Sequence, residues 1–211
     1  MESKSGKALV RESVEKNTQA ARWIRRSQAV VYDNPWIRVE HHEVTAPTGV
    51  DTIYGLIHMH NTAVGIIPID DEAHTWLVGQ LRYPLGAWSW EVPMGGVKLT
   101  EQTQTGETFE QMLLDGAARE LTEETGLSAT RYTELVRLHT SNCVTDELGV
   151  VFLAEGLKHA APTPDPTEQL TVRRVPFREA WNMAMDGSIS DALSVAAIFK
   201  LGVLRPHLIT S

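Results

Sequence analysis

The stretch that decides the fold is RELTEETGL, residues 119–127, which has the composition of a helix ending at a glycine. Residues three and four apart share one side of a helix, so Glu120, Glu123 and Glu124 are expected to converge within about one turn. Arg119 can pair with Glu123 one turn on, which leaves Glu120 and Glu124 free for a ligand. Carboxylate oxygens suit Mg²⁺ or Mn²⁺. A solvated acidic helix face is the alternative.

The flanking residues give this helix a start and an end. Thr108 is a good N-cap, and Gln111 three residues later completes a capping box. Apolar residues then recur with helical spacing until Gly126, which is expected to close the helix as a C-cap. These residues are Phe109, Met112, Leu113, Ala117 and Leu121.

The chain before the helix is mostly β. From Ala29 to Pro84, short runs rich in β-branched and aromatic residues alternate with turns at residues 33–35, 46–49 and 70–74, which predicts antiparallel strands. Residues 85–96 read as an aromatic loop and a short strand that end in the double glycine Gly95-Gly96. The polar residues 1–28 are expected to form a frayed or helical arm.

After the helix come predicted strands at residues 133–140, 148–157 and 171–176, and amphipathic helices at 176–187 and 189–204. Strands first, then a helix, then strands and helices indicate an α+β fold rather than a doubly wound parallel sheet. We therefore expect an arm at 1–28, a β-rich subdomain at 29–61 and the main domain at 62–211.

Composition excludes several classes. The chain has 211 residues, a net charge of −8 and a pI near 5.5, so we expect no nucleic-acid partner. No apolar run approaches the roughly 18–20 residues that span a bilayer. The N-terminal residues lack the apolar stretch of a secretory signal, which predicts a cytoplasmic protein without a membrane partner. A single cysteine, Cys143, excludes an internal disulfide.

The pattern Arg-Glu-aliphatic-x-Glu-Glu-x-Gly-aliphatic has seven constrained positions, and a chance match is on the order of one in 10⁵ at typical residue usage. It resembles the second half of the signature of the Nudix hydrolases, which cleave pyrophosphate bonds in nucleoside diphosphates linked to another group. Gly95 and Glu101 resemble the first half. Seventeen residues separate Glu101 from Arg119, more than in the family, so an insertion around residues 100–108 is expected.

Flanking motifs resemble the branch of the family that hydrolyses ADP-ribose and nucleotide sugars. They are QLRY at 80–83, WEVPMGG at 90–96, YDNPW at 32–36 and GSISDA at 187–192. The resemblance implies an α/β/α sandwich with a mixed sheet, a small β-rich N-terminal extension and a homodimer. Where many ADP-ribose hydrolases carry Ser-Pro-Gly, this chain has Ser141-Asn142-Cys143, so the preferred sugar stays open.

The resemblance also implies roles for individual residues in the metal site. Glu120 and Glu124 would hold Mg²⁺, or alternatively Mn²⁺. The backbone carbonyl of Met94 and the side chain of Glu101 would add ligands. Glu123 and Arg119 would support catalysis from the same helix. Gly95 and Gly96 would let the backbone pass close to the metal, although a tight turn explains them equally well.

Other residues are candidates for substrate binding. Arg82 could clamp a phosphate, because guanidinium suits bidentate contact with phosphate oxygens; a surface arginine is the alternative. Glu91 could line the site or be a plain strand carboxylate. Trp36 could stack on a nucleobase or be a buried tryptophan.

The general base is expected on a loop after the signature. Glu168, in the Pro-rich segment 160–169, matches the position of the catalytic glutamate in the ADP-ribose branch; an ordinary solvated acid is the alternative, and Asp146 and Glu147 are rivals. We therefore predict hydrolysis of a nucleoside diphosphate sugar, ADP-ribose first, to a nucleoside monophosphate and a sugar phosphate. A Nudix-fold sensor without activity and a pyrophosphatase that removes damaged nucleoside triphosphates are the alternatives.

Overall fold

The computed structural model describes residues 22–98, 108–160 and 169–210. The chain divides into two compact units, which meet in sequence between His58 and Met59. Among the helices of the described residues, none combines the length and the apolar character that crossing a bilayer requires.

The first unit is a three-stranded sheet with the order β1-β2-β3. Its strands are β1 (Ile24–Asp33), β2 (Ile37–Thr45) and β3 (Asp51–Met59). Strands β1 and β2 are antiparallel, and all ten residues of β1 are exposed. Because β1 already begins at Ile24, the prediction of an arm reaching to residue 28 was wrong at its end: residues 24–28 pair with β2. Residues 1–21 lie outside the described part.

The second unit holds two sheets. A mixed four-stranded sheet has the order β7-β4-β9-β8, with β4 and β9 parallel and the outer pairs antiparallel. Its strands are β4 (Asn61–Pro68), β7 (Met94–Lys98), β8 (Leu127–His139) and β9 (Leu148–His159). A three-stranded antiparallel sheet has the order β10-β5-β6. Its strands are β5 (His74–Arg82), β6 (Ala87–Glu91) and β10 (Thr171–Pro176).

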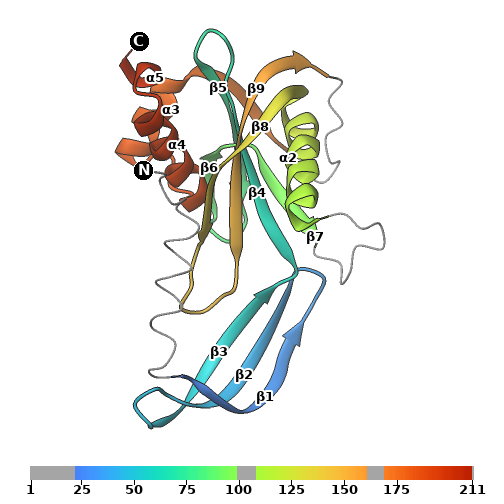
Figure 1. The fold of residues 1–211 in the computed structure, drawn as a ribbon, viewed down its shortest axis with the longest axis vertical. Helices are drawn as coiled ribbons and strands as arrows, with labels where there is room; N and C mark the ends of the chain where they lie inside the picture. The colour runs from blue at the N-terminus through green and yellow to red at the C-terminus, as the bar shows by residue number, and fades with distance from the viewer. Residues whose placement is uncertain (1–21, 99–107, 161–168, 211) are drawn as a thin grey trace, which may run out of the picture. The chain divides into compact units, whose positions relative to one another are not determined.

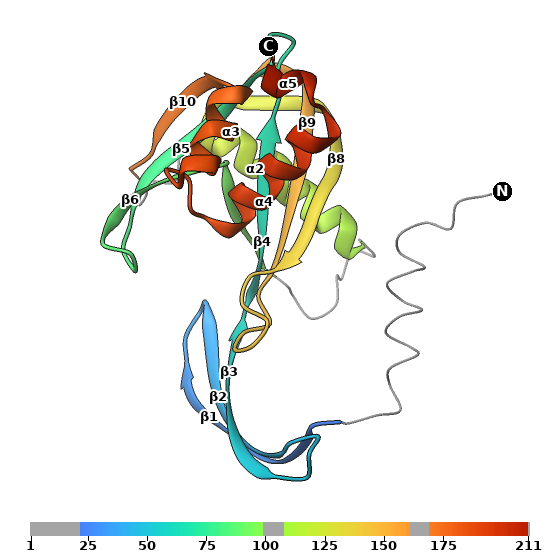
Figure 2. The same cartoon turned by 90° about the vertical axis from the view of Figure 1, so that its left-hand side faces the viewer.

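Helices cover both faces of the mixed sheet (Figures 1 and 2). Helix α2 (Phe109–Thr125) lies on one face, and α3 (Phe177–Asp186) and α4 (Ala192–Leu204) lie on the other. A short helix, α5 (His207–Thr210), which the sequence analysis missed, ends the described chain. The three layers confirm the predicted α+β sandwich with a mixed sheet.

The alternation of side chains along β9 separates two apolar cores. Val150 and Phe152 pack toward Leu113 and Leu121 of α2. The intervening Val151 and Leu153 belong to the other core, which contains Phe177 of α3 and Ile198 and Leu201 of α4. Successive strand residues point to opposite faces, so a strand buried on both sides is apolar throughout. This burial fixes the layer of helix α2 and therefore the position of its acidic residues.

Helix α2 starts and ends where the sequence predicts. The Thr108 hydroxyl accepts a hydrogen bond from the backbone N–H of Gln111, at 3.2 Å. The Gln111 side chain donates to Asp115 instead of completing the capping box. Gly126 has φ 67°, a left-handed conformation that glycine adopts without steric cost, and its N–H donates to the carbonyl of Thr122.

Candidate functional site

The acidic side chains of α2 face strand β7, where the double glycine lies. Gly95 and Gly96 are not in a turn: they pair with Val64 and Ala63 of β4. A Cβ placed on Gly95 would lie 2.1 Å from the carboxyl carbon of Glu120, which is a severe steric clash. Glycine at this position therefore lets the carboxylate of Glu120, a residue only 8% exposed, lie directly against the backbone of β7.

Arg119 binds two of the three glutamates. One guanidinium nitrogen donates to Glu123 at 2.5 Å, and the other donates to Glu120 at 2.5 Å and to the carbonyl of Gly96 at 3.3 Å. Burial lowers the pKa of Arg119, but the charges of Glu120 and Glu123 outweigh it and raise the pKa above its ordinary value. The predicted Arg119–Glu123 pair is confirmed. The expectation that Glu120 stays free of Arg119 was wrong, because Arg119 reaches its immediate neighbour as well.

Glu124 contacts the same strand from the next turn of the helix. Its carboxylate accepts a hydrogen bond of 2.9 Å from the backbone N–H of Met94. The two carboxylates of Glu120 and Glu124 thus lie along β7 at consecutive residues, Gly95 and Met94. No group of three or more His, Cys, Asp or Glu side chains within the described ranges is arranged as a complete metal site. Glu101, the fourth predicted ligand, lies outside the described residues.

Arg82 and Glu91 form a second charged pair at the hairpin of β5 and β6. Val78 lies opposite Glu91 in the register, and alternate residues share a face, so Arg82 and Glu91 lie on the same side. The Arg82 Nε donates to Glu91 at 2.9 Å, and one terminal nitrogen donates to the other carboxylate oxygen. Glu91 is 4% exposed, so Arg82 is its neutralising partner.

The pKa of Arg82 is raised, first by its hydrogen bond to Glu91 and, against the effect of burial, by the charges of Glu91, Asp191 and Glu124. The surrounding carboxylates therefore stabilise the positive charge of Arg82. Arg82 is not an ordinary surface arginine, which was the alternative, because it donates hydrogen bonds to both carboxylate oxygens of the buried Glu91.

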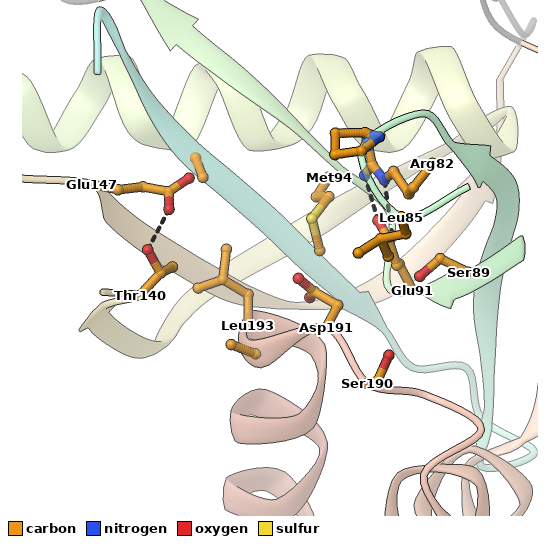
Figure 3. Close-up of a pocket in the computed structure, with 13 residues that line it drawn as sticks. Arg82, Leu85, Ser89, Glu91, Met94, Thr140, Glu147, Ser190, Asp191 and Leu193 are labelled. Carbon is orange, nitrogen blue, oxygen red and sulfur yellow. Dashed lines mark hydrogen bonds and ion pairs between the residues drawn. The ribbon is translucent and has the colours of Figure 1, made fainter. Parts of the chain in front are cut away.

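A cavity of about 620 Å³ opens beside these residues (Figure 3). Strands β5 and β6 with their hairpin contribute Arg82, Pro84, Leu85, Ser89 and Glu91, and Met94 of β7 joins the cavity to the acidic helix. The remaining lining comes from β4, the end of β8, the start of β9 and the start of α4. Those residues are Ala63, Thr140, Glu147, Ser190, Asp191, Ala192 and Leu193.

The start of α4 is tied to the strand segment that carries Glu91 and Met94. Asp191 caps the helix by accepting a hydrogen bond of 2.8 Å from the N–H of Ser194. The fully buried Ser194 hydroxyl accepts one of 3.0 Å from the N–H of Val92. The motif at 187–192 was identified only by its resemblance, and in the structure its residues Ser190, Asp191 and Ala192 line one side of the cavity.

The other predicted residues fall in different places. Trp36 belongs to the first unit and is 65% exposed, so the alternative of a buried tryptophan was wrong. Asp146 accepts a hydrogen bond of 2.9 Å from the N–H of Met59, whereas Glu147 accepts one from the hydroxyl of Thr140 at the cavity edge. Glu168, the predicted base, lies outside the described residues.

The chain is similar in sequence to known protein families and to individual proteins. Residues 59–194 match the NUDIX domain, and residues 23–57 match the nucleoside diphosphate sugar hydrolase N-terminal domain. An ADP-ribose pyrophosphatase of Mycobacterium tuberculosis is 32% identical over 154 residues, which are 72% of this chain and 68% of that protein. An ADP-ribose pyrophosphatase of Bacillus subtilis is 30% identical over 141 residues, 66% of this chain and 71% of that protein.

A solved structure of an ADP compounds hydrolase has the same fold, with a TM-score of 0.73 at 22% identity, and the match covers 90% of this chain and 96% of that one. The family match spans more than half of the chain and contains the acidic helix, the double glycine and the cavity. The resemblance drawn from residues 119–127 is thereby confirmed. The chain belongs to the Nudix family, and the segment ahead of its Nudix domain, residues 23–57, is similar to the N-terminal domain of nucleoside diphosphate sugar hydrolases.

Proposed function

We propose that this protein hydrolyses the pyrophosphate bond of a nucleoside diphosphate sugar, with ADP-ribose as the first candidate. The products would be a nucleoside monophosphate and a sugar phosphate. The observation that carries the proposal is the pair of carboxylates, Glu120 and Glu124, held along β7 next to a cavity that contains Arg82. The relatives named ADP-ribose pyrophosphatases support the choice of substrate.

The residues of α2 fit a divalent cation. Nudix hydrolases generally use such ions, and carboxylate oxygens are the hard donors that Mg²⁺ and Mn²⁺ prefer. Because Gly95 has no side chain, the Glu120 carboxylate can lie directly against the backbone of β7. We propose that Glu120 and Glu124 hold Mg²⁺, or Mn²⁺, with the carbonyl of Met94 and with Glu101. A bound cation would neutralise the diphosphate and lower the pKa of a water molecule.

Arg119 has a positioning role in this proposal. Its contacts with Glu120, Glu123 and the carbonyl of Gly96 hold the side chains of one helical turn against β7. Like charges within one turn repel one another. Arg119 therefore keeps the carboxylates of Glu120 and Glu123 together, and Glu123 in turn fixes Arg119.

Arg82 is proposed to clamp a phosphate of the substrate. Two of its nitrogens donate to Glu91, and the remaining N–H groups of the guanidinium can meet phosphate oxygens. Glu91 is then a positioning residue that acts through Arg82. Glu168 remains the proposed general base, with Asp146 and Glu147 as its rivals, and the exposed ring of Trp36 remains the proposed surface for stacking on a nucleobase.

We also propose that the protein is a homodimer that associates through β1. This strand is the edge of its sheet, and four of its large apolar side chains are at least half exposed: Ile24, Val30, Val31 and Tyr32. An exposed apolar edge strand is a ready template for pairing with another chain. A second copy of β1 would cover both the apolar side chains and the unpaired backbone groups.

The first prediction concerns activity and Glu124. The purified protein with Mg²⁺ is expected to convert ADP-ribose into products from which phosphatase releases phosphate, and Glu124→Gln is expected to lower kcat by about 100-fold or more, because an amide cannot replace the carboxylate charge. Glu110→Gln, an exposed residue in the first turn of the same helix, is the control and should retain the normal rate. Absence of turnover with ADP-ribose and with other nucleotide sugars would reject the proposed function.

The second prediction concerns the dependence of Glu91 on Arg82. Arg82→Lys and Glu91→Gln are each expected to raise the KM for ADP-ribose by about tenfold. If Glu91 acts through Arg82, the double variant should be hardly worse than Arg82→Lys alone, so that a double-mutant cycle gives strong coupling. Additive effects in that cycle, with the fold checked by circular dichroism, would show that Glu91 has a separate role.

The third prediction concerns the dimer. Sedimentation equilibrium is expected to give twice the chain mass of 23.4 kDa, and Val31→Lys should weaken the association because it places a charge in the apolar patch. Thr48→Lys, in the exposed turn between β2 and β3, is the matched control. A wild-type protein that sediments as a monomer at all concentrations contradicts the proposal.

A further inference from the structure

The cavity beside the acidic helix is itself negatively charged. Among its described lining residues, Arg82 is the one lysine or arginine, whereas three residues carry carboxylates: Glu91, Glu147 and Asp191. Both oxygens of Glu91 are bound by Arg82. The positive charge in the cavity is thus matched by Glu91, and the charges of Glu147 and Asp191 are left over.

These two carboxylates are held by neutral donors. The hydroxyl of Thr140 donates to Glu147, and the backbone N–H of Ser194 donates to Asp191 at 2.8 Å. Such hydrogen bonds orient a carboxylate without cancelling its charge. Figure 3 shows Glu147 beside Thr140 and Asp191 near Leu193, among the side chains that line the cavity.

The rest of the lining suits a hydroxylated ligand better than a nucleobase. No aromatic side chain is found among the described residues around this cavity, so these residues offer no ring on which a base could stack. The hydroxyls of Ser89, Thr140 and Ser190 and the carboxylates of Glu147 and Asp191 offer hydrogen-bond acceptors instead. The volume of about 620 Å³ lies within the range of small-ligand sites.

We propose that this cavity receives the sugar half of the nucleotide sugar, and that Glu147 and Asp191 select an uncharged sugar over one that carries its own anionic group. The inference rests on the proposed function, since it assigns the two halves of that substrate. Sugar hydroxyls donate charge-assisted hydrogen bonds to carboxylates. An added carboxylate or phosphate on the sugar would meet like charges in a partly enclosed space, which disfavours its binding.

The test uses two substrates that differ in one group, ADP-glucose and ADP-glucuronate, which replaces the C6 hydroxymethyl group by a carboxylate. The wild-type protein with Mg²⁺ is expected to favour ADP-glucose in kcat/KM by roughly tenfold or more. Most of the difference should lie in KM, because the repulsion is present as soon as the sugar binds.

Isosteric variants test whether Glu147 and Asp191 cause the preference for ADP-glucose. Glu147→Gln keeps an acceptor for Thr140, and Asp191→Asn keeps a helix cap, so each removes a charge with little change in shape. Each is expected to narrow the preference by about threefold or more. Asp71→Asn is the control: it makes the same change of charge at an exposed turn residue that does not line the cavity, and it should keep the wild-type preference.

The outcomes separate this inference from the proposed function. Hydrolysis of ADP-ribose together with equal efficiencies for the two test substrates overturns the inference alone, as does a wild-type preference that both cavity variants retain. If no ADP-sugar is hydrolysed, the proposed function fails, and calorimetric binding of the same two compounds decides the inference. Tighter binding of ADP-glucose supports it, and equal binding or no binding overturns it.

Discussion

The contact between helix α2 and strand β7 is the constraint on which the rest of the structure depends. The carboxylate of the buried Glu120 can lie against this strand only where the strand has no side chain, and that position is Gly95. The next residue back along β7, Met94, donates its N–H to Glu124. One helix face and two strand residues thus fix the positions of the acidic groups, and the apolar contacts of Leu113 and Leu121 behind them fix the helix.

Two arginines balance the charge that this constraint concentrates. Arg119 serves the carboxylates of its own helix, whereas Arg82 serves Glu91, which comes from the neighbouring strand. Burying a carboxylate is costly unless it is paired and hydrogen-bonded, so each arginine stabilises the fold by pairing with a buried glutamate. In a chain with a net charge of −8, the binding of a diphosphate depends on such local cations.

Local sequence patterns predicted the helices and strands, but long-range contacts determine how the strands pair and which side chains meet. Thr108 and Gly126 marked both ends of α2 because capping is a property of a few adjacent residues. A short strand that ends at the double glycine was predicted, but its division into β6 and β7 and the pairing of β7 with β4 were not, because pairing between distant segments is not a local property of the sequence. The partnership of Arg82 with Glu91 depends on the register of a hairpin, which the sequence alone does not fix.

The most direct test of the central claim is the binding of divalent cations at α2. Isothermal titration calorimetry with Mn²⁺, in the presence of a non-hydrolysable analogue of ADP-ribose, measures this binding without relying on turnover. The account predicts saturable uptake by the wild-type protein and its loss in the double variant Glu120→Gln, Glu124→Gln, with the folded state of both checked by thermal unfolding. Equal uptake by the two proteins, or none by the wild type, would contradict it.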